Sequence, residues 1–161
     1  MKEFIQKHKL FSFYTALMLV IVFIAIFAPW IAPGDAFTSD MSKALQAPSA
    51  QHWFGTDKLG RDVLSRIIYG TQLSLFMGVS IVVIMVSIGT VIGAVAGYFG
   101  GKVEMVLMRL ADIMLSFPGV VLAIAIAGIL GGSIVNTILA LSVVGWAKYA
   151  RLVRSMTLKV R

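Results

Sequence analysis

Long uncharged stretches alternate with short charged segments along the chain. Residues 10–34, 67–101 and 113–147 contain no Asp, Glu, Lys or Arg. An α-helix rises about 1.5 Å per residue, so about 20 apolar residues are enough to cross the hydrocarbon core of a bilayer. Each stretch can therefore hold at least one crossing, and the pattern predicts an all-α integral membrane protein.

The first two stretches predict one transmembrane helix each, over about 10–31 and about 73–97. A cleaved signal peptide is the alternative for the first, because lysines precede its apolar run. That run outlasts the roughly 7–15 apolar residues of a signal core. In addition, no Ala-x-Ala cleavage pattern precedes Pro29 or Pro33. We therefore interpret the first stretch as a membrane anchor.

The second predicted helix carries three glycines spaced four residues apart, Gly89, Gly93 and Gly97. This spacing puts them on nearly one face. Within lipid, apolar burial does not drive helices together, and small residues let two backbones approach closely. The spacing predicts a helix-packing face, and the alternative is that glycine is simply common in transmembrane helices.

The third stretch divides at the double glycine 131–132 into two predicted helices, over about 113–130 and about 134–150. Each is short for a crossing, but charged flanking side chains can extend it by snorkelling. Pro118 suits a first helical turn or a kink near the membrane surface. One helix through two glycines is unfavourable. The pattern thus predicts four transmembrane helices.

An amphipathic segment precedes the second predicted transmembrane helix. Asp57 stands four residues before Arg61, and Asp62 four before Arg66, which is the favourable order for ion pairs on a helix. Apolar residues recur on one face of the same segment. The pattern predicts an amphipathic helix over about 57–70 at the outer membrane interface, with a solvated helix as the alternative.

The end of the chain continues the fourth predicted helix as a basic amphipathic helix. At 100° per residue most apolar side chains share one arc, opposite to the basic residues Lys148, Arg151, Arg154, Lys159 and Arg161. A stop-transfer cluster on anionic lipid is one interpretation. A helix that leaves the membrane for a cytoplasmic partner is the other. The last residues include no glycine and no polar tail, so we expect a longer protein.

Composition and charge agree with a membrane protein. Of the residues, 59% are hydrophobic and 13% are charged, whereas soluble domains carry about 25% charged residues. A soluble monomer and a disordered chain are excluded, and the absence of cysteine excludes a disulfide scaffold. The net charge of +7 would suggest nucleic acid for a soluble protein. Here it indicates asymmetric loops, and no nucleic-acid partner is expected.

The Lys and Arg residues predict the orientation. With the N-terminus inside, ten of the 14 fall in inner segments and four in outer segments, which follows the positive-inside rule. The N-terminus and residue 161 are then both cytoplasmic. The chain divides into an N-terminal region, 1–72, which includes the outer segment, and a transmembrane region, 73–161.

No catalytic, cofactor or metal site is predicted. The histidines His8 and His52 fall in opposite compartments on this topology. Residues 97–102 lack the phosphate-loop pattern, which would need Gly at Ala96 and Ser or Thr at Val103. Apart from Lys148 near the end of the fourth, the predicted spans hold no Asp, Glu, Lys, Arg or His, whereas ion-coupled transporters usually have such a residue at membrane depth. For uphill transport, we expect the energy to enter from another chain.

Several short motifs follow one another with characteristic spacing. The first group lies in and just after the outer segment and comprises Gly55, Thr56, Asp57, Gly60, Arg61, Asp62, Ser65, Arg66, Tyr69, Gly70, Ser74 and Leu75. The second comprises 96–101, Met108, Arg109, Asp112, Pro118 and 149–154. Together they resemble the C-type permeases of the ATP-binding-cassette (ABC) importers for dipeptides, oligopeptides and nickel, over nearly the whole chain. Gln72 stands where this family commonly has arginine, and Glu104 where it commonly has aspartate.

The resemblance implies a six-helix permease of the bacterial inner membrane, paired with a second homologous permease. It also implies two cytoplasmic ABC ATPases and an extracytoplasmic solute-binding protein. ATP hydrolysis on the ATPases would switch the permease pair between outward- and inward-open states, so the permease itself is not an enzyme. In the family, the ATPase-docking loop with its E-A-A motif begins just after the position of Arg161. The sequence resembles the first two-thirds of such a permease, and this part alone is not expected to transport.

The motifs do not distinguish peptide from nickel systems, and two other functions are alternatives to an importer. A self-contained four-helix channel or exporter would form a homo-oligomer, associate through the face around Gly93 and work without ATP. A membrane-embedded enzyme is disfavoured because the predicted spans hold no His, Asp or Glu.

Overall fold

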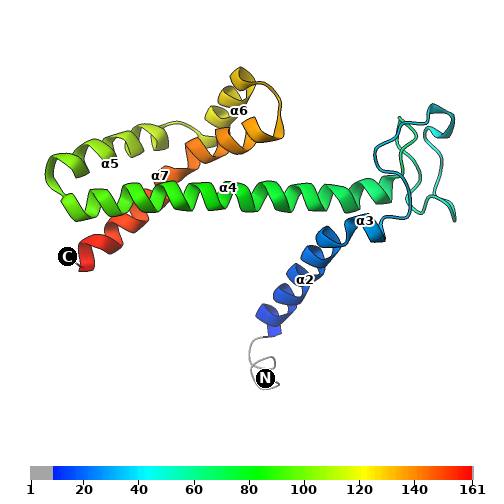
Figure 1. Ribbon diagram of the computed structural model, residues 1–161, viewed down its shortest axis with the longest axis horizontal. Coiled ribbons are helices and arrows are strands. Elements are labelled where there is room, and N and C mark those ends of the chain that lie inside the picture. The colour runs from blue at the N-terminus through cyan, green and yellow to red at the C-terminus, as the bar shows by residue number, and fades with distance from the viewer. Residues whose placement is uncertain (1–8, 161) are drawn as a thin grey trace. The chain divides into compact units, whose positions relative to one another are not determined.

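The computed structural model describes residues 9–160, and these are helical apart from loops and one isolated β-bridge. The chain folds as two compact units, Met1–Phe76 and Met77–Arg161. Figure 1 follows the helices in chain order from α2 to α7. An all-α architecture is therefore confirmed for the described residues.

The first unit begins with α2, Lys9–Ile26, and the short α3, Ala28–Ile31. Pro29 stands in the first turn of α3. Its ring removes a backbone N–H and crowds the preceding turn, so it starts a new helix but does not continue the old one. The single helix predicted over about 10–31 is thus corrected to two helices that break at Phe27.

A folded loop connects α3 to α4 and contains one turn of 3-10 helix, η1, Met41–Lys43. The side chain of Asp40 caps η1 by accepting the Ser42 N–H at 3.1 Å. The two sides of the loop are joined by the backbone N–H of Asp40, which donates to the Leu59 carbonyl at 2.9 Å. The loop is therefore held by its own hydrogen bonds.

The amphipathic helix predicted over 57–70 is wrong in its first part, because α4 begins only at Val63. The Asp57 side chain accepts two backbone N–H groups within the next four residues, which closes a turn in place of a helix. Gly60 has a φ of +75°, which no helical residue adopts. Asp62 then caps α4 by accepting the backbone N–H three residues later at 2.8 Å.

Helix α4, Val63–Phe99, is one helix of 37 residues. It joins the rest of the predicted outer helix to the predicted span 73–97, which were expected to be separate elements. The residues between them are Thr71 and Gln72, and α4 contains no proline, so nothing in this part of the sequence stops the helix.

The second unit continues with α5, Gly101–Ser116, α6, Gly119–Leu130, and α7, Ile134–Val160. The chain turns between α4 and α5 at Gly100 and Gly101, which both have positive φ. Helices α5 and α6 both pack on α7. Helix α7 therefore holds this unit together.

The helix predicted over about 113–130 is wrong, because α5 and α6 meet at a 90° bend. Phe117 has an extended backbone with ψ of 146°, as expected for a residue that precedes a proline. Pro118 then stands at the N-cap of α6. Helix α5 also begins at Gly101, well before the predicted start.

The break predicted at Gly131 and Gly132 is confirmed. Gly131 has a φ of +90°, and the Ser133 hydroxyl caps α7 by accepting the Asn136 N–H at 3.1 Å. Helix α7 continues without interruption from the predicted fourth span, 134–150, into the predicted basic helix. Arg161 lies outside the described residues.

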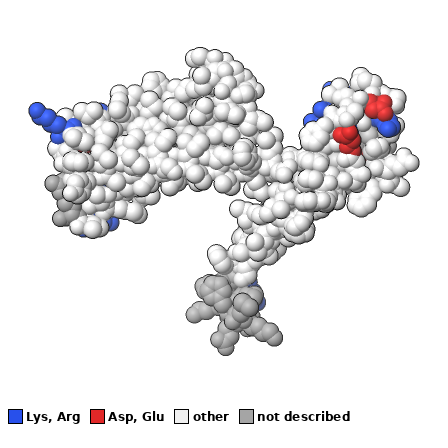
Figure 2. Space-filling model, viewed as in Figure 1, with Lys and Arg blue, Asp and Glu red and all other residues white. Residues whose placement is uncertain are grey.

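By length and composition, α2 and α4 can cross a membrane, and the bent pair α5–α6 adds a third span if it counts as one. Within each of these two helices only 6% of the most apolar window is buried inside the described chain. In Figure 2 residues other than Lys, Arg, Asp and Glu cover most of the visible helix surface, and the acidic side chains that this view shows lie on the loop between α3 and α4. Four crossings stay a prediction.

Candidate functional site

The three glycines of α4 face α7. A Cβ added to Gly89 would lie 2.5 Å from the Tyr149 Cβ, and one added to Gly97 would lie 2.7 Å from the Thr157 Cβ. At Gly93 the added atom would collide with the Ala150 carbonyl oxygen. A side chain larger than hydrogen therefore has no room along this line, and the glycines let the two backbones touch.

Helix α7 meets α4 with small residues of its own. Ala150, which is fully buried, lies against Gly93. A Cβ at Gly145 would collide with the Met85 side chain of α4. Our sequence interpretation did not assign Gly145 and Ala150 to the packing face, although small residues on one side of a helix are a signal of such a face. Because α7 of the same chain occupies the glycine face, that face is not free for a second copy.

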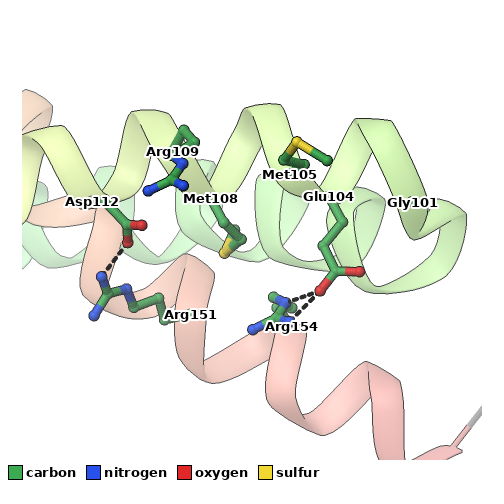
Figure 3. A pocket seen from close by; sticks show the side chains of 8 residues that line it. All are labelled: Gly101, Glu104, Met105, Met108, Arg109, Asp112, Arg151 and Arg154. Atoms are coloured by element: carbon green, nitrogen blue, oxygen red, sulfur yellow. Dashed lines mark hydrogen bonds and ion pairs between the residues drawn. The ribbon is translucent and has the colours of Figure 1, made fainter.

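Two ion pairs join α5 to α7 (Figure 3). Glu104 Oε1 accepts a hydrogen bond from Arg154 Nε at 2.6 Å and a second from the same guanidinium. Asp112 Oδ1 accepts a hydrogen bond from Arg151. The two arginines are thus held by acidic residues from a helix that lies far away in the sequence.

A cavity of about 610 Å³ lies between these ion pairs, lined by Gly101, Glu104, Met105, Met108, Arg109, Asp112, Arg151 and Arg154. Within the described residues, Arg109 forms no ion pair. The other predicted basic residues, Lys148 and Lys159, are exposed. Lys159 lies in the last turn of α7, where a positive charge complements the helix dipole.

The ion pairs orient the end of α7 more than they stabilise the fold. The side chains of Arg151 and Asp112 are 50% and 45% exposed. Exposed pairs of this kind contribute about 0–1 kcal/mol. Their geometric effect is larger, because two pairs along antiparallel helices fix both the register and the direction of α7. Our sequence interpretation named all four residues but did not pair the arginines with Glu104 and Asp112.

In the first unit, Asp62 and Ser65 form a buried link between the loop and α4. Asp62 is 2% exposed and Ser65 is fully buried. Asp62 Oδ1 lies 3.0 Å from His52 Nδ1, and the Ser65 hydroxyl accepts the Gly34 N–H at 2.9 Å. Burial would raise the pKa of Asp62, but hydrogen bonds from Ser65 and His52 outweigh it and lower this pKa.

Asp57 holds the other side of the loop. Its Oδ2 accepts the Arg61 Nε–H at 3.0 Å and also pairs with Arg66. Partial desolvation would raise the pKa of Asp57, but the backbone N–H and guanidinium of Arg61 and the backbone N–H of Leu59 hold it well below its usual range. Asp57 is therefore ionised whenever the loop is folded at neutral pH.

The small motif residues of the loop have structural roles. Gly55 has a φ of +70°, and a Cβ there would collide with the Gln46 carbonyl oxygen. A Cβ at Gly60 would collide with the Asp40 carbonyl oxygen. The Thr56 hydroxyl accepts the Gln46 N–H at 2.8 Å. Each of these motif residues thus shapes the loop.

The motif residues Tyr69 and Gly70 line a groove beside the first turns of α4. The groove has a volume of about 580 Å³ and is also lined by Phe37, Arg61 and Arg66. The ring of Phe37 packs edge-on against Tyr69 with centroids 4.9 Å apart. A Cβ at Gly70 would meet no atom within 4 Å.

The described residues contain no group of three or more His, Asp or Glu side chains that could hold a metal ion. His8 lies outside the described residues. His52 contacts Asp62 inside the first unit, where its ring links the loop to the start of α4.

Two protein-family profiles match the chain. The profile described as "Binding-protein-dependent transport system inner membrane component" matches residues 89–161, which covers α5, α6, α7 and the glycine face of α4. The profile described as "N-terminal TM domain of oligopeptide transport permease C" matches residues 5–48. The motifs of 55–75 lie outside both matched ranges.

Similar proteins extend the match across those motifs. A dipeptide transport system permease protein of Alkalihalophilus pseudofirmus is 42% identical over 157 residues, which is 98% of this chain and 52% of that protein. A glutathione transport system permease protein of Escherichia coli is 43% identical over 99% of this chain and 53% of that protein. The chain belongs to the binding-protein-dependent transport permeases.

A third similar permease, a probable D,D-dipeptide transport system permease protein of Escherichia coli, is 41% identical over 90% of this chain and 49% of that protein. The chain thus spans about half the length of the curated relatives it matches. The described residues of this chain contain three structural features: the α4–α7 packing face, the α5–α7 ion pairs and the folded loop between α3 and α4.

Proposed function

We propose that this chain is part of a permease subunit of a binding-protein-dependent ABC importer that moves peptides across the bacterial inner membrane. The supporting observation is the alignment of nearly the whole chain, at 41–43% identity, with permeases named for dipeptide, glutathione and D,D-dipeptide transport. All three names specify peptides, which favours a peptide over nickel as the substrate. The permease is not an enzyme, because ATP hydrolysis takes place on separate subunits.

The membrane arrangement has four crossings. Helices α2 with α3, α4, the bent pair α5–α6 and the uncharged first half of α7 each make one, within a six-helix complete permease. The N-terminus and residue 161 lie in the cytoplasm, as the ten inner and four outer Lys and Arg residues indicate. The loop between α3 and α4 then faces the outside. The chain divides into an N-terminal region, 1–72, which contains this loop, and a transmembrane region, 73–161.

The partners are a second homologous permease, two cytoplasmic ABC ATPases and an extracytoplasmic solute-binding protein. The basic end of α7 lies toward the ATPases. Glu104 and Asp112 of α5 fix its direction by binding Arg154 and Arg151. A movement of the segment that follows α7 is therefore transmitted to α5. Close backbone packing at Gly93 transmits the same movement to α4.

Uptake in proteoliposomes tests this function. The complete permease that contains this chain is reconstituted with its partner permease, the ATPases and the binding protein, and uptake of a labelled dipeptide is measured with and without ATP. We expect ATP-dependent dipeptide uptake and no nickel uptake. The 161-residue chain in place of the complete permease is the matched control and is expected to give no uptake. Uptake by the chain alone without ATP would instead support a self-contained channel.

A further inference from the structure

The groove beside the first turns of α4 is charged at one end and apolar at the other. Arg66, Tyr69, Leu73 and Phe76 follow one another on α4 at spacings of three or four residues, so they share one face. At about 1.5 Å per residue, Arg66 and Phe76 are about 15 Å apart along the helix axis. Along the groove, a guanidinium is therefore followed by a phenol and then by two apolar side chains.

The charged end carries an excess of positive charge. Arg61 and Arg66 both bind the single carboxylate of Asp57, with Arg61 Nη2 at 2.8 Å from Oδ2. Two guanidinium groups against one carboxylate leave one positive charge unbalanced. The Arg66 side chain is 44% exposed, and its guanidinium carries five N–H donors, of which Asp57 occupies one. The remaining donors are free to bind an anion.

The apolar end is open. Leu73 is 43% exposed and Phe76 is 62% exposed, and Phe37, which also lines the groove, is 69% exposed. Gly70 leaves the floor of the groove empty, since a Cβ there would meet no atom within 4 Å. This part of the groove can accept an alkyl chain without any change in the fold.

We propose that the groove is a binding site for one anionic phospholipid of the leaflet at this end of α4. The phosphate lies against the free N–H groups of Arg66 and Arg61, since the guanidinium fork matches the oxygens of a phosphate. Tyr69 lies at the level of the headgroup, where tyrosine is enriched in membrane proteins. The first part of an acyl chain lies over Gly70, Leu73 and Phe76. A free phosphate would satisfy the charged end alone, whereas a lipid satisfies both ends.

The site requires α4 to be in a membrane and does not require transport. Native mass spectrometry of the purified full chain in detergent, titrated with phosphatidylglycerol against a phosphatidylcholine background, measures retained lipid directly. Failure of dipeptide uptake would leave this result unaffected, so the site and the importer function are tested independently.

Gly70→Leu fills the floor of the groove without removing a charge, and Gly78→Leu is its matched control. Both glycines lie in α4 with no atom within 4 Å of an added Cβ. We expect Gly70→Leu to lower retained phosphatidylglycerol at least fivefold and Gly78→Leu to leave it unchanged. Arg66→Gln tests the charged end and is expected to lower retention by a similar factor, with the exposed Lys58→Gln as control.

Any one of the following results would overturn the lipid site. The first is equal retention by the wild-type chain and Gly70→Leu, or equal loss in Gly70→Leu and Gly78→Leu. The second is displacement of the lipid by glycerol phosphate at the same concentration as phosphatidylglycerol, which would indicate a site for a free anion. The third is a photo-crosslinker at Gln72 that, in the assembled complex, labels a partner protein and no lipid.

Discussion

One carboxylate oxygen of Glu104 on α5 accepts two hydrogen bonds from the guanidinium of Arg154 on α7, across 50 positions of sequence. Partial exposure of both side chains, 21% and 35%, limits what this pair adds to stability. Its consequence is geometric, because it fixes where the basic end of α7 leaves the unit.

The first prediction concerns this pair. Glu104→Gln and Arg154→Gln are each expected to lower the free energy of unfolding by about 1 kcal/mol or less. Their double mutant should show coupling, since each change removes the same contact. In the assembled importer both variants should reduce ATP-dependent uptake severalfold. Unfolding is followed by thermal denaturation in detergent, and Lys148→Gln, which has an exposed side chain, is the control. A coupling of zero would contradict a stabilising contact between the two side chains.

The second prediction concerns the α4–α7 contact. Gly93→Ala places a methyl group against the Ala150 carbonyl and is expected to destabilise the second unit by about 1–3 kcal/mol. Gly78→Ala lies on the same helix in open space and should be neutral or slightly stabilising, because alanine is the better helix former. Thermal denaturation in detergent compares the two variants. Equal stability of both would refute the packing role of Gly93.

The third prediction concerns the turn at Gly60. Its φ of +75° and the nearby Asp40 carbonyl leave no place for a side chain. Gly60→Ala should therefore open the loop between α3 and α4, with a loss of about 1–3 kcal/mol in local stability. Protease cleavage within residues 44–60 should accelerate at least tenfold in this variant. Gly70→Ala, which adds a methyl group in open space, should cleave at the wild-type rate.

The fourth prediction concerns pH. Hydrogen bonds from the hydroxyl and amide of Thr38 and from the amide of Phe37 lower the pKa of Asp35 from 3.8 to about 2. A carboxyl with a lowered folded-state pKa adds stability above its unfolded pKa and loses it as pH falls through the folded value. Protection of the Phe37 and Thr38 amides from hydrogen exchange should thus weaken between about pH 4 and about pH 2, after correction for intrinsic exchange.

Asp35→Asn is the comparison for that experiment. The amide side chain keeps an acceptor oxygen but carries no charge, so protection should be weaker at neutral pH and should not change in the same range. A wild-type chain whose amides are equally protected at both ends of the range would contradict the assignment.

The elements that the sequence predicted well are those set by local composition. Uncharged apolar stretches specify α2 and α4, because no Asp, Glu, Lys or Arg within residues 10–34 and 67–101 opposes burial in lipid. The double glycine at 131–132 specifies the break before α7, since both residues disfavour a continuing helix. The glycines of α4 were identifiable because their four-residue spacing is a local property.

The errors have local and long-range causes. Asp57 and Arg61 have the spacing of a helical pair, and they do form an ion pair, but Asp57 also accepts backbone N–H groups that close a turn. The same charge pattern fits both a helix and a turn, so the pattern alone does not distinguish them. Pro118 is compatible with a first turn or a kink, and the local sequence does not give the angle. The partners of Arg151 and Arg154 depend on how α5 lies on α7, which no local pattern contains.

The bend between Ser116 and Gly119 leaves main-chain carbonyl groups near the end of α5 without the hydrogen bonds they would accept in a continuous helix. Pro118 has no amide hydrogen to offer, and the Ser116 hydroxyl donates to only one of them, the Ile113 carbonyl, at 2.7 Å. Hydrocarbon cannot solvate the others, so such backbone persists at membrane depth only beside water or beside protein. Wherever α5 and α6 enter the bilayer, the backbone at this bend must therefore contact water or protein in place of lipid.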